Sequence, residues 1–389
     1  MKAALDIPNR DARRLWLAAN GLSGAPAGPV DVPGMIAALG LLQLDTIRNV
    51  TRAHNHILWS RNHRYREGML WPHLASRALF EHFTHDASLL PVSLLPLWQV
   101  QFRRLGARAA RGAWYQSGLT RAEIEAIRAR IEQEGPLSTQ AFETRTDSRG
   151  MWARPPHKKV LDQLWYAGDL ATAHRQNFVK FYDLGARIFP PHDPLPEDRA
   201  LIRLADDALD RLGVATPGEV QRFWGVASAP ETRAWAERAE TVPVRVQAAD
   251  GSWRAALAHP SIETRLGTAP EPPGRLRILN PFDPAIRDRA RLERLFGFDY
   301  RNEMFVPADQ RRWGYYVYPL LDRDSFVGRM EIKGNRAAGT IEVTGFWPEP
   351  ASRWGAGRIA RLDAELRRFA ALAGADTVIW TAPRPDARP

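Results

Sequence analysis

The apolar pattern of this 389-residue chain changes at about residue 241. Before that point apolar residues recur mainly at three- and four-residue steps, as at Ile124, Ile127 and Ile131, which is the spacing of one helix face. After it, alternating apolar and polar residues predict antiparallel strands of a small barrel or sheet, at 242–246, 313–318, 326–332 and 339–343. A last helix is expected over 352–373. The pattern predicts an α+β protein whose C-terminal part is β-rich.

A short helix, a glycine turn and a basic hairpin form a unit that recurs before residue 241. The best copy runs from 158 to 182, with Trp165 in the helix, Gly168 in the turn and 174–177 at the tip of a wing. A weaker copy runs from 205 to 224. Helix-turn-helix plus wing is the simplest unit that fits, although plain helical hairpins can give a similar pattern.

We therefore expect tandem winged-helix units followed by a barrel-like domain. The predicted divisions are a helical and winged-helix region over 1–118, a winged helix over 119–190, a further such unit over 191–240 and the β-rich domain over 241–389 with its terminal helix. The prolines at 190–196 predict a flexible link between winged units.

Three helix starts carry capping signals. A helix over 9–23 is expected to be capped by Asn9 or Asp11, and a second helix starts near Asp31. A third helix over 119–134 follows Thr120 and Glu123, which have the spacing of a capping box.

The composition favours a partner that carries phosphate. The net charge is +10, with 49 arginines against 5 lysines, and the guanidinium group binds phosphate bidentately. A GC-rich genome explains the arginine preference equally well, but it does not explain the net charge. The absence of cysteine excludes disulfides, thiolate metal sites and a cysteine nucleophile. No secretory leader and no long apolar run are recognisable, so we expect a cytoplasmic protein without membrane contact.

The segment 41–47 places Gln43 and Asp45 two residues apart in an apolar run. In an extended chain the two side chains share one face, roughly 6.6 Å apart along the strand. The expected helix over 47–61, with His54 and Arg61 on one face, follows at once, so Asp45 could instead be its N-cap.

These segments resemble the YcaQ-type (AlkX/AlkZ-like) winged-helix DNA glycosylases, whose studied members unhook interstrand crosslinks. The resemblance spans nearly the whole chain and is carried by Gln43-Leu44-Asp45, the histidine-rich 52–61, 81–91, Leu164 to Leu170, Pro281-Phe282-Asp283-Pro284 and Gly314 to Val317. The family has glutamine-x-glutamine and glutamine-x-aspartate variants, and this chain has the second. That variant implies a broader range of substrates, including N7-alkylated purines and crosslinks. The family usually has a tryptophan where this chain has Arg287.

The resemblance implies that Asp45 is the general base and stabiliser, with Gln43 positioning the water. No lysine lies near the motif in the sequence, so Schiff-base chemistry is disfavoured and a monofunctional enzyme is expected. The expected substrate is double-stranded DNA with alkylated or crosslinked purines, bound without sequence specificity in an open cleft by a monomer associated with the nucleoid. No cofactor and no metal are expected.

Basic residues near the motif and on the first wing are candidates for DNA contact, with a solvated basic face as the alternative. They are Arg48, Arg52, His54, Arg61, His85, Lys158, Lys159, His174 and Arg175. The six histidines between 54 and 85 could in principle bind a metal, but their spacing does not match a ligand set. Asp86 is either a second active-site carboxylate or the cap of a helix that contains Ser88.

A winged-helix transcriptional regulator is the alternative function, in which Gln43 and Asp45 are structural. Nothing after residue 350 resembles the coiled coil that such a dimer would need.

Overall fold

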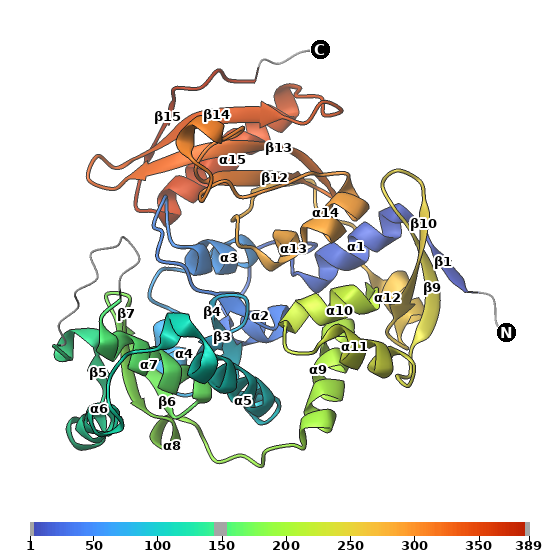
Figure 1. Ribbon diagram of the computed structural model, residues 1–389. Helices are drawn as coiled ribbons and strands as arrows, with labels where there is room; N and C mark the ends of the chain where they lie inside the picture. The colour runs from blue at the N-terminus through green and yellow to red at the C-terminus, as the bar shows by residue number, and fades with distance from the viewer. Residues whose placement is uncertain (1–3, 144–153, 386–389) are drawn as a thin grey trace. The chain divides into compact units, whose positions relative to one another are not determined.

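The computed structural model describes residues 4–143 and 154–385. The chain forms two compact units, built from the elements labelled in Figure 1. The first unit comprises Met1–Glu67, Asp206–Phe223 and Thr232–Pro389, and the second comprises Gly68–Ala205 and Trp224–Glu231. Within the described ranges, no helix is both long and apolar enough to span a bilayer.

The second unit contains a β-hairpin, a long helix and a winged helix. Its elements are α4 (Trp71–Ala75), β3 (Leu79–Phe83), β4 (Ala87–Pro91), η1 (Val92–Leu94), α5 (Leu95–Arg111), η2 (Ala113–Tyr115), α6 (Arg121–Glu134), β5 (Leu137–Ser138), η3 (Thr139–Ala141), α7 (Pro156–Ala167), β6 (Leu170–Gln176), β7 (Val179–Leu184) and α8 (Gly185–Ile188). Both α9 (Glu197–Leu212) and α10 (Pro217–Trp224) cross the sequence boundaries between the units.

The winged helix predicted at 158–182 is confirmed. The capping box starts α6, because Thr120 accepts the N–H of Glu123 and the Glu123 carboxylate accepts the N–H of Thr120 at 2.7 Å. Helix α7 ends at Gly168, and the hairpin β6–β7 follows in a sheet of order β5-β7-β6. Trp165 of α7 packs with residues of α6 and β7 in one apolar core.

Gly168 lies at the end of α7, where the backbone packs closely against Phe102 of α5. Its φ is +81°, and a Cβ there would lie 2.6 Å from Cδ2 of Phe102. We expect Gly168→Ala to lower the free energy of unfolding by about 2–4 kcal/mol, as the sum of left-handed backbone strain and overpacking. Gly118→Ala is the matched control, because Gly118 has φ +75° and open space around it. Urea unfolding followed by circular dichroism should show a clearly larger loss for Gly168→Ala; equal losses would contradict the packing argument.

The first unit begins with helices and a mixed sheet of order β1-β9-β10-β8. The elements are β1 (Leu5–Ile7), α1 (Asn9–Ala19), α2 (Val32–Leu39), β2 (Leu42–Gln43), α3 (Ala53–Arg61), β8 (Val214–Ala215), β9 (Val242–Gln247), β10 (Trp253–Ala258) and α12 (Ile262–Thr268). Helix α11 (Ala229–Ala236), like α9 and α10, crosses a sequence boundary between the units. The hairpin β9–β10 has β8 on one edge and β1, parallel to β9, on the other. The weaker unit predicted at 205–224 thus contains β8 and α10, while the hairpin that pairs with β8 lies beyond these bounds.

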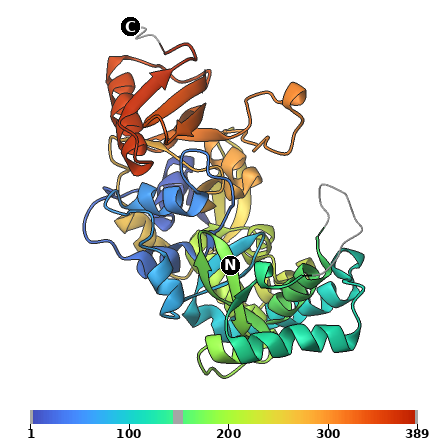
Figure 2. The ribbon, with the colours of Figure 1, turned by 90° about the vertical axis from the view of Figure 1, so that its left-hand side faces the viewer.

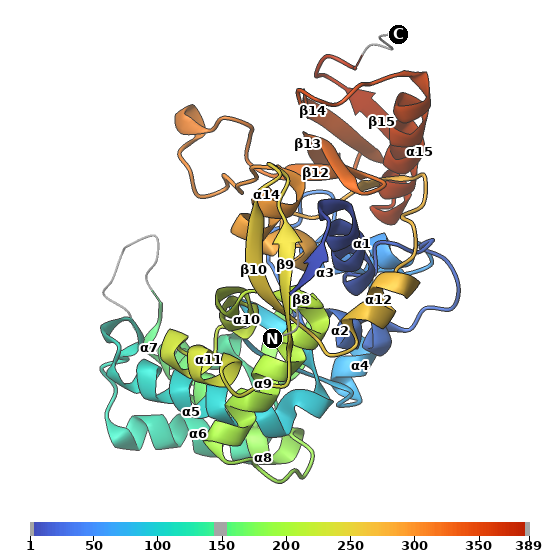
Figure 3. The same ribbon diagram turned by 90° about the vertical axis from the view of Figure 1, so that its right-hand side faces the viewer.

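A curled half-barrel sheet of order β11-β12-β13-β14-β15 completes the first unit. The elements are β11 (Leu276–Ile278), α13 (Pro284–Arg287), α14 (Arg289–Phe296), η4 (Ala308–Gln310), β12 (Val317–Asp322), β13 (Ser325–Asn335), β14 (Thr340–Pro348), α15 (Ala356–Leu372) and β15 (Thr377–Trp380). Helix α15 contacts both edge strands of this sheet and buries Leu362, Leu366 and Phe369. Figure 3 shows this helix beside β15. The α+β fold class is confirmed.

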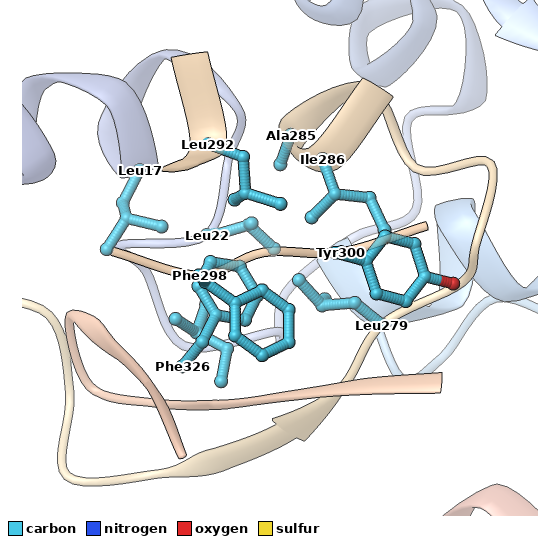
Figure 4. Packing of buried hydrophobic residues seen from close by; sticks show 10 residues of the cluster. Leu17, Leu22, Leu279, Ala285, Ile286, Leu292, Phe298, Tyr300 and Phe326 are labelled. Carbon is cyan, nitrogen blue, oxygen red and sulfur yellow. The ribbon is translucent and has the colours of Figure 1, made fainter. Parts of the chain in front are cut away.

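One apolar core joins the N-terminal helix to the C-terminal strands. Figure 4 shows Leu17 and Leu22 packed with Leu292, Phe298 and Phe326. Phe298 and Phe326 stack with their ring centroids 4.7 Å apart. The segment that contains Gln43 and Asp45 thus follows a helix fixed to the C-terminal part of the same unit.

Several local expectations were wrong. The N-cap of α1 is Pro8 rather than Asn9 or Asp11, because the Asn9 amide donates to the carbonyl of Leu295 at 2.9 Å. Strand β12 begins at Val317 rather than at 313, because the N–H groups of 312–314 bind the carboxylate of Glu303.

The sheet is also not wholly antiparallel. Strand β15 pairs parallel to β14. Helix α15 is the crossover that such a connection needs. The predicted cap of the second helix is confirmed, since Asp31 accepts the N–H of Gly34 at 2.9 Å. The four-part division of the chain stays a prediction.

Candidate active site

The paired amide and carboxylate lie at the end of β2 in the first unit. Gln43 is 8% exposed and Asp45 is half-buried. One carboxylate oxygen of Asp45 accepts the N–H of Ile47 at 2.7 Å. This contact closes a turn of the Asx type and fixes the orientation of the carboxylate.

The alternative role of Asp45 as a helix cap is excluded by the structure. Helix α3 begins at Ala53 with Arg52 as its N-cap. The first six residues of the helix expected over 47–61 are therefore not helical. Those residues take another path, since Arg48 and Arg52 form an isolated β-bridge and the amide of Asn49 donates to the hydroxyl of Tyr318 at 3.1 Å.

A buried polar chain includes Tyr316, which lies within electrostatic range of Asp45. The amide of Asn280 lies 3.3 Å from the Tyr316 hydroxyl and 3.4 Å from Nδ1 of His56. His56 Nε2 lies 3.0 Å from the carbonyl of Ile278. Burial raises the pKa of Tyr316 well above its ordinary value, and the charge of Asp45 adds to this shift. Tyr316 is therefore a neutral phenol within electrostatic range of Asp45.

Burial also keeps His56 neutral, since it lowers the pKa of the imidazole to about 3. A carbonyl can only accept, so Nε2 donates to Ile278 and Nδ1 accepts from Asn280. The amide of Asn280 then donates to Tyr316, which leaves the phenol proton available to another acceptor.

The basic surface of the first unit includes one arginine that the sequence analysis did not single out. Arg48 and Arg336 both pair with Glu67, at 2.9 Å and 2.6 Å, and their side chains are 41% and 37% exposed. Glu67 also accepts a hydrogen bond from Thr51. The segment that follows Asp45 is thus attached to the β13–β14 turn by a shared carboxylate.

Two other candidates of the first unit are buried. His54 is 1% exposed, and the Arg61 guanidinium is paired with Asp283 inside the fold. Arg52 is half-buried. The buried pair with Asp283 gives Arg61 a structural role, and the DNA contacts expected of His54 and Arg61 stay a prediction.

The five remaining candidates belong to the second unit and differ in exposure. His85 and Lys158 are exposed. The Lys159 ammonium donates to the carbonyl of Gln116 at 3.0 Å, and His174 stacks on Phe181 with centroids 4.6 Å apart. These residues belong to a different unit from Asp45.

Arg175, expected at the wing tip, lies within strand β6 and pairs with a buried acid. Its guanidinium donates to both oxygens of Glu81, each at 2.7 Å. Lys180 lies 3.1 Å from the same carboxylate, and its ammonium sits over the ring of Trp165. Burial alone would raise the pKa of Glu81, but Lys180 and Arg175 together hold it at about 2. Because burial lowers the pKa of Lys180, Arg175 is the firmer partner.

The low pKa of Glu81 predicts acid sensitivity of the second unit. The ion pair stabilises the fold fully above the ordinary pKa of 4.5 and is lost as the pH falls toward about 2, a change on the order of 3 kcal/mol. We expect Glu81→Gln to be less stable at neutral pH, because Arg175 loses its charged partner. Its unfolding free energy should also fall less steeply below pH 4.5 than that of the wild type.

Glu134→Gln is the control, because Glu134 pairs with Arg130 on an exposed helix surface. Urea unfolding at several pH values, followed by tryptophan fluorescence, measures the slopes. An unchanged slope in Glu81→Gln would contradict the assignment.

Asp86 does not cap a helix, because Ser88 lies in strand β4. Its carboxylate accepts the N–H of Ala87 in the turn between β3 and β4. Among the described residues, no three His, Asp or Glu side chains are grouped in a way that could hold a metal ion.

The motif Pro281-Phe282-Asp283-Pro284 has a structural role. Asp283 caps α13 through the N–H of Ala285 and pairs with Arg61. Arg287, the departure from the family pattern, donates to the carbonyl of Phe223 at 2.7 Å and lies over its ring.

Sequence reasoning missed Tyr316, whose pKa the charge of Asp45 helps to raise, and Asn280 and His56, which are linked to it. It also missed Arg336 and Lys333, which lie near the segment that follows Asp45. Lys333 is exposed on β13, and the backbone of its neighbour Gly334 abuts Asn49 and Val50. Tyr316 could have been found from its place in the Gly314 to Val317 motif, whereas Asn280 and Lys333 carry no comparable signal.

The fold is shared with a known structure, Streptomyces sahachiroi DNA glycosylase AlkZ. The TM-score is 0.68 at 16% sequence identity, and the match covers 97% of this chain and 99% of that one. The AlkZ-like DNA glycosylase family matches residues 36–372, and the chain belongs to this family. It is a DNA glycosylase whose substrate is DNA.

Proposed function

We propose that this glycosylase hydrolyses the N-glycosidic bond of N7-alkylated purines in double-stranded DNA and unhooks interstrand crosslinks. Asp45 is the general base and electrostatic stabiliser, and Gln43 positions the water. The observation that carries the proposal is the Asp45 carboxylate, half-buried at the end of β2 and fixed by the N–H of Ile47 at 2.7 Å.

The lesion itself reduces what the enzyme must supply. Alkylation at N7 makes the purine cationic, so the leaving group needs little help from an acid. What remains is to stabilise a sugar with growing positive charge and to deprotonate water, and one carboxylate can do both. The Gln43 amide can donate to and accept from that water. Tyr316 stays neutral beside Asp45, so it adds no second negative charge.

A crosslinked purine is tethered to the opposite strand and cannot be swung into a closed pocket. We therefore propose that Asp45 acts in an open cleft, on DNA held by phosphate contacts from Arg48 and Arg52. In the cell a monomer would act on the nucleoid.

The test is incubation of the protein with a duplex that carries a single N7-methylguanine, followed by alkali. Strand breakage at the lesion after alkali, and none before it, is the expected result for a monofunctional enzyme. Borohydride added during the reaction should trap no covalent complex. A trapped complex would contradict the monofunctional mechanism, and Lys333→Ala would then show whether Lys333 is the nucleophile.

A further inference from the structure

Phe305 is the most exposed of the large apolar side chains among the described residues, at 85%. It lies in the loop that joins α14 to β12, which we call the Phe305 loop (residues 297–316). Figures 2 and 3 show this loop, with η4, standing away from the C-terminal sheet of the first unit. Burial of this ring against a partner would remove apolar surface from water and would be favourable.

Internal hydrogen bonds and buried side chains stabilise the Phe305 loop. Tyr300 is buried at its base and donates to the carbonyl of Val317 at 2.6 Å. Across the loop, the carboxylate of Glu303 accepts the N–H groups of Arg312, Trp313 and Gly314, the shortest at 2.7 Å. Met304, next to Phe305, is only 6% exposed. These contacts stabilise the Phe305 loop on both sides of the exposed Phe305 side chain.

The returning arm of the loop leads to the candidate active site. It ends at Tyr316, the buried phenol within electrostatic range of Asp45. The guanidinium of Arg311 lies 5.0 Å from the ring centroid of Tyr315, and that of Arg312 lies 4.3 Å from the ring centroid of Trp313. Guanidinium groups therefore flank this arm.

A loop of this kind can contact DNA either through its charges or through its aromatic ring. Three arginines (301, 311 and 312) are balanced by three acids (299, 303 and 309), so the net charge of the loop is zero. The loop therefore adds little to long-range attraction, and its distinctive group is the aromatic ring. In proteins that bind the minor groove, exposed phenylalanines open base steps by insertion.

We propose that Phe305 is a wedge that enters the base stack of duplex DNA beside the lesion. This inference rests on the proposed function, in which Asp45 acts on the sugar of a damaged base. A crosslinked base cannot be flipped out of the helix, and unstacking beside it would expose its sugar. A second copy of the chain or a protein partner are the other occupants that an exposed phenylalanine could serve.

The test uses duplexes with 2-aminopurine at successive positions, because its fluorescence rises on unstacking whether or not excision occurs. At saturating wild-type protein we expect a rise at one step. Phe305→Ala should lose most of that rise and cut excision by about tenfold, the worth of one stacked ring. Its salt dependence of binding should be unchanged, because no charge is removed. Phe305→Trp should retain the rise.

Ile379→Ala is the matched control, because Ile379 is exposed at 42% in the same unit. It should behave as the wild type. An equal fluorescence rise in Phe305→Ala, or a wild-type dimer in light scattering that becomes a monomer in Phe305→Ala, would overturn the wedge. If wild-type protein unstacks DNA but excises no N7-methylguanine, the proposed substrate fails and the wedge stands.

Discussion

Replacing Asp45 by asparagine is expected to slow excision of N7-methylguanine by about a thousandfold while DNA binding is retained. The amide cannot deprotonate water and carries no charge to stabilise the sugar cation. It can still accept the N–H of Ile47, so the turn after β2 survives. The loss therefore belongs to the chemistry and not to folding. Single-turnover excision gives the rate, and fluorescence anisotropy with an alkylated duplex gives the affinity.

Asp31→Asn is the control for this substitution. Asp31 also accepts a backbone N–H, that of Gly34 at 2.9 Å, but it caps α2 and has no proposed part in catalysis. It should excise at the wild-type rate. Full activity of Asp45→Asn would remove Asp45 from the mechanism.

Removing Asp283 is expected to have the largest effect on stability. The side chains of Arg61 and Asp283 are 4% and 0% exposed, and their second contact is 2.7 Å. In Asp283→Ala the guanidinium stays buried without its charged partner, which typically costs about 3–5 kcal/mol. The variant also loses the cap of α13. We expect a much lower urea midpoint for the first unit.

Two further variants make this result specific. In Glu271→Ala the exposed pair with Arg10 is lost, and little change is expected. The double variant R61M/D283L removes both charges together and should recover part of the stability. If Asp283→Ala and Glu271→Ala unfold at the same midpoint, the buried pair does not stabilise the fold.

Local signals in the sequence predicted local structure well. The capping box at Thr120 and the wing after Gly168 depend on residues a few positions apart, and both are confirmed. Pairings between distant segments were not predictable in this way. Arg61 reads as a surface cation because its partner Asp283 lies 222 residues away. Arg175 and Glu81 are 94 residues apart in the sequence. Arg175 stands among basic residues of the wing, so the sequence gives no sign that it forms a buried ion pair.

The same limit applies to the candidate site. The Gln43 and Asp45 pair was found because both residues fall in one short motif. The polar chain behind it was missed, because His56, Asn280 and Tyr316 come from three distant segments. The family membership identifies the enzyme, and the geometry adds which groups approach Asp45.

The most direct test of the account is unhooking of a nitrogen-mustard crosslink between two labelled strands. Under single-turnover conditions, the wild-type protein should separate the strands and leave an alkali-labile abasic site, while Asp45→Asn binds the duplex and leaves the crosslink intact. Crosslinks that persist with the wild-type protein would contradict the proposed substrate. Equal unhooking by both proteins would contradict the central role of Asp45.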